Sequence, residues 1–236
     1  MRRSIALLMS SLRVAALVTP FIAGAAGAQV GYIPARSPYL DLEQAQELTL
    51  IVGTYHGHKD VAGVAPQGGT LIGAHYEWRA GGPAHLIAEV AGVNSNSLVL
   101  NPFKSGAARD LGNLSRPLYT ADFDLGLSLT GAKSWHHLVP EVQGGVGLIS
   151  DFRSQPDTGG FKFGTRFSFN VGAGIRYVPG ERWAFRVDLK DRLYTIGYPE
   201  SYYVAPAGGT SIIPSSQAKS FWTNNPALTI GISRLF

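Results

Sequence analysis

The chain has 236 residues, of which 45% are hydrophobic and only 15% are charged. Soluble globular proteins average about 25% charged residues, so this composition favours a fold with a large apolar outer surface. The length fits one domain, and the absence of cysteine excludes disulfides, thiolate metal sites and a cysteine nucleophile.

The N-terminus predicts an export signal that ends at Ala28. Arg2 and Arg3 give it a positive start, residues 14–23 are apolar, and small residues stand where signal peptidase would cleave. A transmembrane anchor is the alternative, but the apolar stretch is short and contains Pro20. We therefore expect the segment to be removed after export.

Removing residues 1–28 changes the charge balance of the chain. The segment carries three arginines and no acidic residue, so the basic residues fall from 20 to 17 against 16 acidic ones. The formal net charge falls from +4 to +1. A nucleic-acid partner would need a basic surface, and none is expected here.

Residues 29–47 form a lead-in segment that contains two prolines and an acidic run from Asp41 to Glu47. A short periplasmic helix, a cap under the following domain and a disordered lead-in are all compatible with this composition. The domain proper is expected to span residues 48–236.

Eight segments beyond the lead-in alternate apolar and polar residues. No apolar run there approaches the ~20 residues of a membrane-spanning helix, whereas the alternating segments have about the 9 to 11 residues of a tilted transmembrane strand. The predicted strands are Leu48 to His56, Thr70 to Arg79, His85 to Val93, Tyr119 to Leu129, Leu138 to Ile149, Phe163 to Tyr177, Trp183 to Leu193 and Pro226 to Phe236.

Alternation alone does not distinguish a lipocalin-like soluble barrel from a membrane barrel. The connections decide, because those after the second, fourth and sixth strands are short and the others are longer. The short ones are Ala80 to Ala84, Thr130 to His137 and Val178 to Arg182. Tight periplasmic turns that alternate with long outer loops are typical of membrane barrels. The sequence therefore predicts an all-β fold, an eight-stranded antiparallel up-and-down transmembrane β-barrel.

The polar faces of these strands carry charged residues that would meet inside the barrel. Eight strands leave an interior just wide enough for side chains, and opposite charges in so narrow a space should pair rather than line a wide pore. We expect a lumen salt-bridge network formed by Glu77, Glu89, Asp122, Asp124, Glu141, Arg166, Arg176, Arg186, Asp188 and Lys190. With Arg79 and Arg192 added, six acidic residues face six basic ones.

Aromatic residues stand at the predicted strand ends. Trp78, Trp135, Tyr177 and Trp183 fall at the end with the short turns, and Trp222 falls at the opposite rim. Aromatic rings gather at membrane interfaces because they prefer the headgroup boundary to water or hydrocarbon. The alternative, ordinary core tryptophans, does not predict this placement.

The C-terminal strand carries a further pattern, because the chain stops at Phe236 with Gly231 and Thr229 at fixed spacings before it. In these positions the sequence resembles the OmpA-type family of eight-stranded outer-membrane barrels. The resemblance implies that the three residues are a signal for the barrel-assembly machinery. Arg234 departs from the family, which usually has an aromatic or apolar residue there.

Two constellations could carry chemistry. His56, His58 and Asp60 open the first outer loop and could bind a metal, but the group is exposed and a plain polar loop is the better interpretation. Some barrels of this type are lipid-modifying enzymes with a serine, a histidine and an acid. His75 and Glu77 share the lumen face without a serine placed beside them, so no catalytic set, metal or cofactor is expected.

The sequence thus predicts an outer-membrane barrel with a structural or surface-interaction role and no catalytic activity. Its expected partners are outer-membrane lipid and the barrel-assembly machinery, and the long loops, which are where such barrels carry recognition, do not specify a surface ligand. A narrow channel or carrier of small hydrophobic solutes, a lipid-modifying enzyme and a secreted soluble binder are the alternatives.

Overall fold

The computed structural model describes residues 37–236. The predicted signal and the first part of the lead-in segment lie outside the described residues. Tyr39–Phe236 form one compact unit, and no helix in the described part is long and apolar enough to cross a bilayer.

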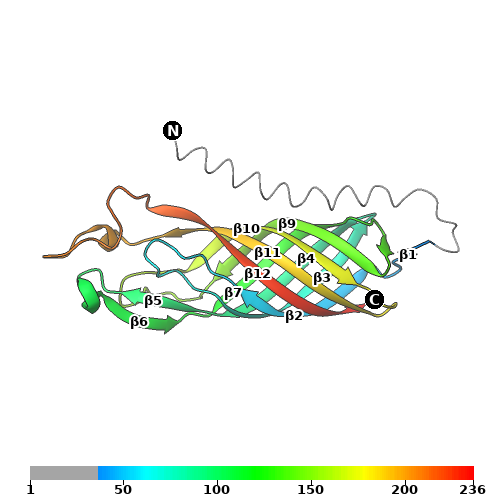
Figure 1. The fold of residues 1–236 in the computed structure, drawn as a ribbon, viewed down its shortest axis with the longest axis horizontal. Coiled ribbons are helices and arrows are strands. Elements are labelled where there is room, and N and C mark those ends of the chain that lie inside the picture. Colours follow the sequence, from blue (N-terminus) through cyan, green and yellow to red (C-terminus); the bar gives the residue numbers. More distant parts are fainter. Residues whose placement is uncertain (1–36) are drawn as a thin grey trace. The chain divides into compact units, whose positions relative to one another are not determined.

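Eight antiparallel strands close into a barrel (Figure 1). Each strand pairs with the next barrel strand in the chain, and β12 pairs with β2 to complete the ring. The barrel strands are β2 (Gln46–Tyr55), β3 (Gly69–Gly81), β4 (Ala84–Asn94), β7 (Leu118–Ser128), β9 (Leu138–Ser150), β10 (Thr165–Tyr177), β11 (Trp183–Gly197) and β12 (Ser220–Leu235). The predicted all-β barrel and its eight segments are confirmed, with β11 and β12 longer than the sequence pattern indicated.

Four short strands lie outside the ring. β5 (Asn96–Leu100) and β6 (Asp110–Ser115) form a hairpin that projects from the barrel as an outer loop, joined by η3 (Gly106–Arg109). At the opposite end, β1 (Tyr39–Asp41) pairs with β8 (Lys133–Trp135). A second 3-10 helix, η4 (Glu200–Tyr203), lies in the last outer loop. None of these short strands and 3-10 helices was predicted from the sequence.

The barrel strands turn their apolar residues outward. Phe123, Phe167 and Val187 are 56%, 52% and 50% exposed. Arg186 and Asp188, on the inner face of β11, are only 3% and 7% exposed. A water-soluble barrel would show the opposite arrangement because apolar side chains would fill its interior. The apolar exterior is therefore the surface of a barrel that spans a membrane.

An apolar core fills the outer half of the lumen. The ends of the strands and the outer loops both contribute to it, through fully or nearly fully buried side chains that include Tyr55, Val64, Leu71, Leu118, Ile149, Phe161, Phe163, Tyr194, Ile196, Tyr202 and Ile213. Tyr55 and Tyr194 join hydroxyl groups across this core at 2.8 Å. The outer loops thus pack against the strand ends in one apolar cluster.

The segment before β2 lies against the periplasmic end of the barrel. Leu42 N donates to the Ala132 carbonyl, and the carbonyl of Leu42 accepts a hydrogen bond from Arg79 Nη1 at 2.6 Å. Ala45 O accepts from Arg79 N at 2.8 Å. Residues 42–45 thus contact the barrel end through backbone hydrogen bonds, and the role of the lead-in segment stays a prediction.

Candidate functional site in the lumen

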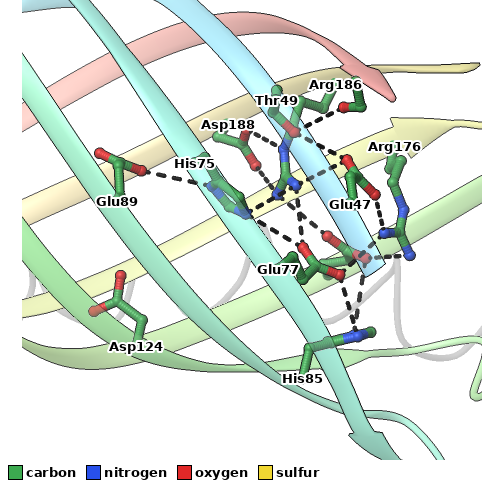
Figure 2. A network of polar contacts seen from close by, with 12 residues as sticks. Glu47, Thr49, His75, Glu77, His85, Glu89, Asp124, Arg176, Arg186 and Asp188 are labelled. Carbon is green, nitrogen blue, oxygen red and sulfur yellow. Dashed lines mark hydrogen bonds and ion pairs between the residues drawn. The ribbon is translucent and has the colours of Figure 1, made fainter. Parts of the chain in front are cut away.

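The half of the lumen nearer the periplasmic end, the inner half, holds a continuous network of ion pairs (Figure 2). At its centre is Arg186, whose guanidinium lies 2.7 Å from Asp188 and 3.1 Å from Glu77. The same guanidinium lies 3.4 Å from both Glu47 and Glu141. One buried cation thus holds carboxylates from four strands, which is possible only because the sheet closes on itself.

Arg176 makes a second bridge beside the first. Its Nη1 contacts Glu47 and lies 3.0 Å from Glu77 Oε1, while its Nη2 lies 3.0 Å from Glu141 Oε1. Two planar guanidinium groups therefore share the same three carboxylates. Arginine suits this arrangement because its five donors are fixed in one plane and its charge is permanent.

A second layer lies nearer the middle of the barrel. Lys190 Nζ lies 2.9 Å from Glu89 and 2.8 Å from Asp124, and Arg192 Nη2 lies 2.6 Å from Glu89 and 2.7 Å from Asp122. His75 connects the two layers, because its ring nitrogens lie 3.3 Å from Glu77 and 3.7 Å from Glu89.

Strand register explains why the network also needs ion pairs that cross the lumen. Glu47 is directly opposite Glu77 in the β2–β3 ladder, and Arg176 is directly opposite Arg186 in the β10–β11 ladder. Like charges in such positions destabilise a sheet when they are left alone. Each like-charged pair is neutralised by the pair on the other wall, so the network requires both walls.

Glycines provide the space that these side chains occupy. Gly147 is the ladder partner of Asp122, and Gly174 is the ladder partner of Asp188. A Cβ atom on either glycine would lie 2.1 Å from an oxygen of the carboxylate opposite, a distance that real atoms do not tolerate. These two glycines therefore stand where an acidic side chain of the neighbouring strand turns into the lumen.

The structure brings together nine of the ten residues of the expected network, namely Glu77, Glu89, Asp122, Asp124, Glu141, Arg176, Arg186, Asp188 and Lys190. Arg166 is placed elsewhere, and its expected role is corrected. It is half-buried near the outer end of β10 and donates to the carbonyl oxygens of Phe163 and Lys162. Its side chain thus binds backbone carbonyl groups just before β10 and forms no ion pair of the network.

Two members of the network escaped the sequence analysis. Glu47 was assigned to the lead-in segment, but β2 begins at Gln46, and Glu47 shares the lumen face with Thr49. His85 stands at the start of β4, with Nδ1 3.2 Å from Glu77. Glu47 could have been found only by extending the first strand toward the N-terminus, because Glu47 lies two residues before Thr49 and so shares its face.

The buried charges do not balance. Seven carboxylates are almost completely buried in the barrel against four permanently charged cations, namely Glu47, Glu77, Glu89, Asp122, Asp124, Glu141 and Asp188 against Arg176, Arg186, Lys190 and Arg192. Arg79, expected among the inward bases, lies at the periplasmic mouth and is only partly buried. The predicted equality of charges is therefore wrong, and the lumen carries an excess of acidic groups.

Three residues of the network are close enough to hold a metal ion, but the Arg176 guanidinium already binds their oxygen atoms. Oxygen and nitrogen atoms of Glu77, His85 and Glu141 lie within 4.8 Å of one another. The oxygens nearest His85 are Glu77 Oε1 and Glu141 Oε1, and these same atoms accept from Arg176 at 3.0 Å. A metal ion there would have to displace the guanidinium group, so the cluster reads as an internal salt bridge.

The other constellation of the sequence analysis is a loop structure. Asp60 accepts hydrogen bonds from the backbone N–H groups of Val64 and Ala65 and from the hydroxyl of Tyr198. Burial, together with this carboxylate, raises the pKa of Tyr198 above its usual value. His56 is exposed. Asp60 therefore ties the first outer loop to the last one.

One arrangement has the connectivity of a catalytic triad. Ser128 Oγ lies 2.8 Å from His85 Nε2, and His85 Nδ1 lies 3.2 Å from Glu77 Oε1. The sequence analysis missed the serine because it comes from β7, far away in the chain. Ser128 also lies 3.2 Å from Glu141, and the cavity that reaches His85 and Glu77 has a volume of only about 20 Å³. That space holds about one water molecule and no ester substrate.

The outer loops contain a buried ion cluster of their own. Arg116, which is 1% exposed, lies 2.8 Å from Asp151 and 3.0 Å from Asp157, and its guanidinium stacks over the ring of Phe161. Arg116 Nε also donates to Ser97 in the β5–β6 hairpin. This cluster, which the sequence analysis did not identify, joins the second and third outer loops.

The remaining predicted site residues are the interface aromatics and the three residues of the C-terminal strand. Trp78, Tyr177, Trp183 and Trp222 are exposed on barrel strands, and Trp135 is exposed on β8, outside the ring. Thr229 and Gly231 face the lumen on β12, and a Cβ on Gly231 would lie 2.6 Å from Thr49. Phe236 exchanges two backbone hydrogen bonds of 3.0 Å with Gln46, and its side chain is exposed.

The sequence matches no protein-family model and no curated protein. Its fold is similar to solved outer-membrane barrels. Neisserial surface protein A aligns with a TM-score of 0.49 and 10% identity, over 81% of this chain and 97% of the other. Outer membrane protein OprG from Pseudomonas aeruginosa gives 0.48 and 13%, over 82% and 97%. The N-terminal β-barrel domain of OprF from Pseudomonas aeruginosa gives 0.47 and 12%, over 82% and 98%. The similarity is one of fold alone.

Proposed function

We propose that this protein is a structural or surface-interaction barrel of the bacterial outer membrane, with a closed lumen and no catalytic activity. The apolar exterior of the barrel supports insertion in a membrane, because lipid is the only solvent in which such a surface is stable. The loops of the outer end, which include the projecting β5–β6 hairpin, are the part available to a partner.

The filled lumen is the observation that carries the proposal. Ion pairs occupy the inner half and an apolar core occupies the outer half. Two cavities among the lumen side chains have volumes of about 10 and 20 Å³. A larger cavity of about 210 Å³ lies at the periplasmic mouth, between residues 40–44 and the barrel end, and is lined by Arg79 and Arg176. A water-filled path for ions needs a connected space, and neither half offers one to a hydrated ion.

Planar-bilayer recording of the purified mature protein tests the closed lumen. We expect no steady current at moderate voltage, while heat-modifiable migration on a gel verifies that the same sample contains a folded barrel. A variant with Tyr55→Ala and Tyr194→Ala, which removes two rings from the outer core, is a useful comparison, because the inner ion pairs should still block it. A stable ohmic conductance of the unaltered protein would contradict the proposal and favour the narrow channel.

Hydrolysis is the second candidate function, and one observation favours it. The contacts among Ser128, His85 and Glu77 have the distances of a nucleophile, a base and its orienting acid. A hydrolase would require Ser128 to react with a fluorophosphonate probe, which modifies activated serines. Because the surrounding space admits only about one water, we expect no labelling of the folded protein. Labelling that Ser128→Ala abolishes would replace the structural role with a catalytic one.

A further inference from the structure

The lipid-facing wall of the barrel is hollowed in its outer half. Four neighbouring strands, β3, β4, β7 and β9, line a groove of about 530 Å³. Its floor is made by small outward-facing residues, chiefly Ala74, Gly92 and Ala121, and Ile72 and Leu148 stand along its sides. Sites for small molecules in proteins have volumes of about 300 to 1,000 Å³, so this groove is large enough for a ligand.

Strand register builds the groove from alternating small and large residues. Gly92 has Ile72 on one side and Tyr119 on the other, and Ala121 has Val90 and Leu148. A Cβ on Gly92 would lie 4.0 Å from the ring of Tyr119, so this ring lies close to the glycine. The depression therefore arises because small residues on this patch of the wall are flanked by larger ones.

An aromatic pair forms the outer rim of the groove. The rings of Tyr119 and Phe152 are 5.3 Å apart, and Phe152 is 76% exposed. Phe152 has a φ of 50°, a conformation that bulky residues rarely adopt. Its N–H donates to Ser150 Oγ, and the neighbouring Asp151 is fixed by Arg116. The loop thus presents an apolar ring at the end of the groove rather than burying it.

A cation stands directly beyond this rim. Arg153 follows Phe152 in the chain and is exposed, and its Nη2 donates to the carbonyl of Ser115 at 2.7 Å. The structure places no carboxylate of the described residues within ion-pair distance of Arg153. Its remaining N–H donors are available to an anion, and a guanidinium binds carboxylate and phosphate in bidentate geometry. Of these two groups, phosphate is the one that membrane phospholipids carry.

We propose that the groove binds one acyl chain of a phosphate-bearing lipid of the outer leaflet, with the phosphate at Arg153. The inference rests on the proposed membrane location, because lipid hydrocarbon chains contact the groove only if the barrel lies in a membrane. The aromatic pair marks the level of the headgroup boundary, where rings of this kind gather. An acyl chain that runs down from this level meets the small residues of the groove, and its headgroup meets Arg153.

Lipid selectivity in vesicles tests this proposal. The purified mature protein is reconstituted in phosphatidylcholine vesicles with spin-labelled phosphatidic acid or, separately, spin-labelled phosphatidylcholine. The motionally restricted fraction of each label reports binding to the protein surface. We expect the unaltered protein to prefer the phosphatidic acid by about three- to fivefold, the selectivity of one cation at a membrane surface.

Three variants separate the parts of the proposal. Ala121→Phe fills the groove and should reduce the restricted fraction of both labels, whereas Ala173→Phe adds the same ring to an outward-facing alanine of β10, outside the groove, and should change neither. Arg153→Gln should remove the preference for phosphatidic acid alone. Unchanged lipid restriction in Ala121→Phe would overturn the groove, and unchanged preference in Arg153→Gln would overturn the headgroup contact.

The two proposals fail in different ways. A protein that does not enter vesicles, or that shows no heat-modifiable migration, would overturn the membrane location and with it the groove. A folded barrel that is fully inserted but restricts both labelled lipids equally would overturn the groove proposal and leave the membrane location intact.

Discussion

Arg186→Met is the substitution that most directly tests the lumen network. Methionine retains much of the side-chain volume but removes the cation that contacts Asp188, Glu77, Glu47 and Glu141. Only Arg176 would remain to neutralise three of these carboxylates, and Asp188 would lose the partner that binds it in bidentate geometry. Removing one partner of a buried ion pair costs about 3 to 5 kcal/mol of stability, because the other charge is left without compensation.

Glu141→Gln is the matched control, because it removes a charge of the opposite sign from the same cluster. The lumen has more buried carboxylates than permanent cations, so a neutral amide at this position reduces the excess of negative charge. Glutamine also keeps an acceptor for Arg176 and for Ser128. We expect the free energy of unfolding to change by no more than about 1 kcal/mol in either direction.

Urea-induced unfolding in detergent micelles, followed by tryptophan fluorescence, measures both variants. The same sample is run unheated and heated on a gel, so that a variant that never folded is recognised before its unfolding curve is interpreted. A loss of less than about 1 kcal/mol in Arg186→Met, or an equal loss in Glu141→Gln, would show that Arg186 does not hold the network together.

Three further predictions concern single contacts. Gly145→Val should prevent a stable barrel, because its Cβ would lie 2.2 Å from the backbone carbonyl oxygen of Phe123; heat-modifiable migration detects the loss, and a folded variant would show that the wall can shift. Tyr198 should remain neutral at pH 10, where an exposed tyrosine is about half ionised, because its pKa is raised; the ultraviolet difference between unaltered protein and Tyr198→Phe measures this. Asp60→Ala should release the first outer loop to proteolysis, whereas His56→Ala should not.

The strands and their facing were predictable because they depend on a local pattern. Apolar and polar residues alternate with the two-residue period of a strand. In a membrane barrel the apolar face points outward and the polar face points into the lumen, the opposite of a soluble barrel. The inward orientation of Arg186 and Asp188 could therefore be read from β11 alone. The membrane-facing position of Phe123 and Phe167 followed in the same way.

The pairing of the charges was not predictable from the sequence, because it depends on positions across the barrel. Arg166 and Arg79 have the correct facing but lie away from the inner carboxylates, Arg166 at the outer end of β10 and Arg79 at the periplasmic mouth, where each donates to backbone carbonyl oxygens instead. Glu47 enters it because β2 begins earlier than the apolar pattern suggested. Likewise, the Arg116 cluster connects loops that have no recognisable motif. Facing is a property of one strand, whereas a contact is a property of two or more.

The lumen side chains form two groups of different chemistry, and the independence of the two groups can be measured. The outer core is joined by the hydroxyl contact of Tyr55 and Tyr194, while Arg186 holds the inner network, and the two groups share no hydrogen bond or ion pair within the described residues. The costs of Tyr194→Phe and Arg186→Met should therefore add within about 0.5 kcal/mol in the double variant. A coupling above about 1 kcal/mol would mean that the outer core and the ion network stabilise one another, so that opening either half would also open the other.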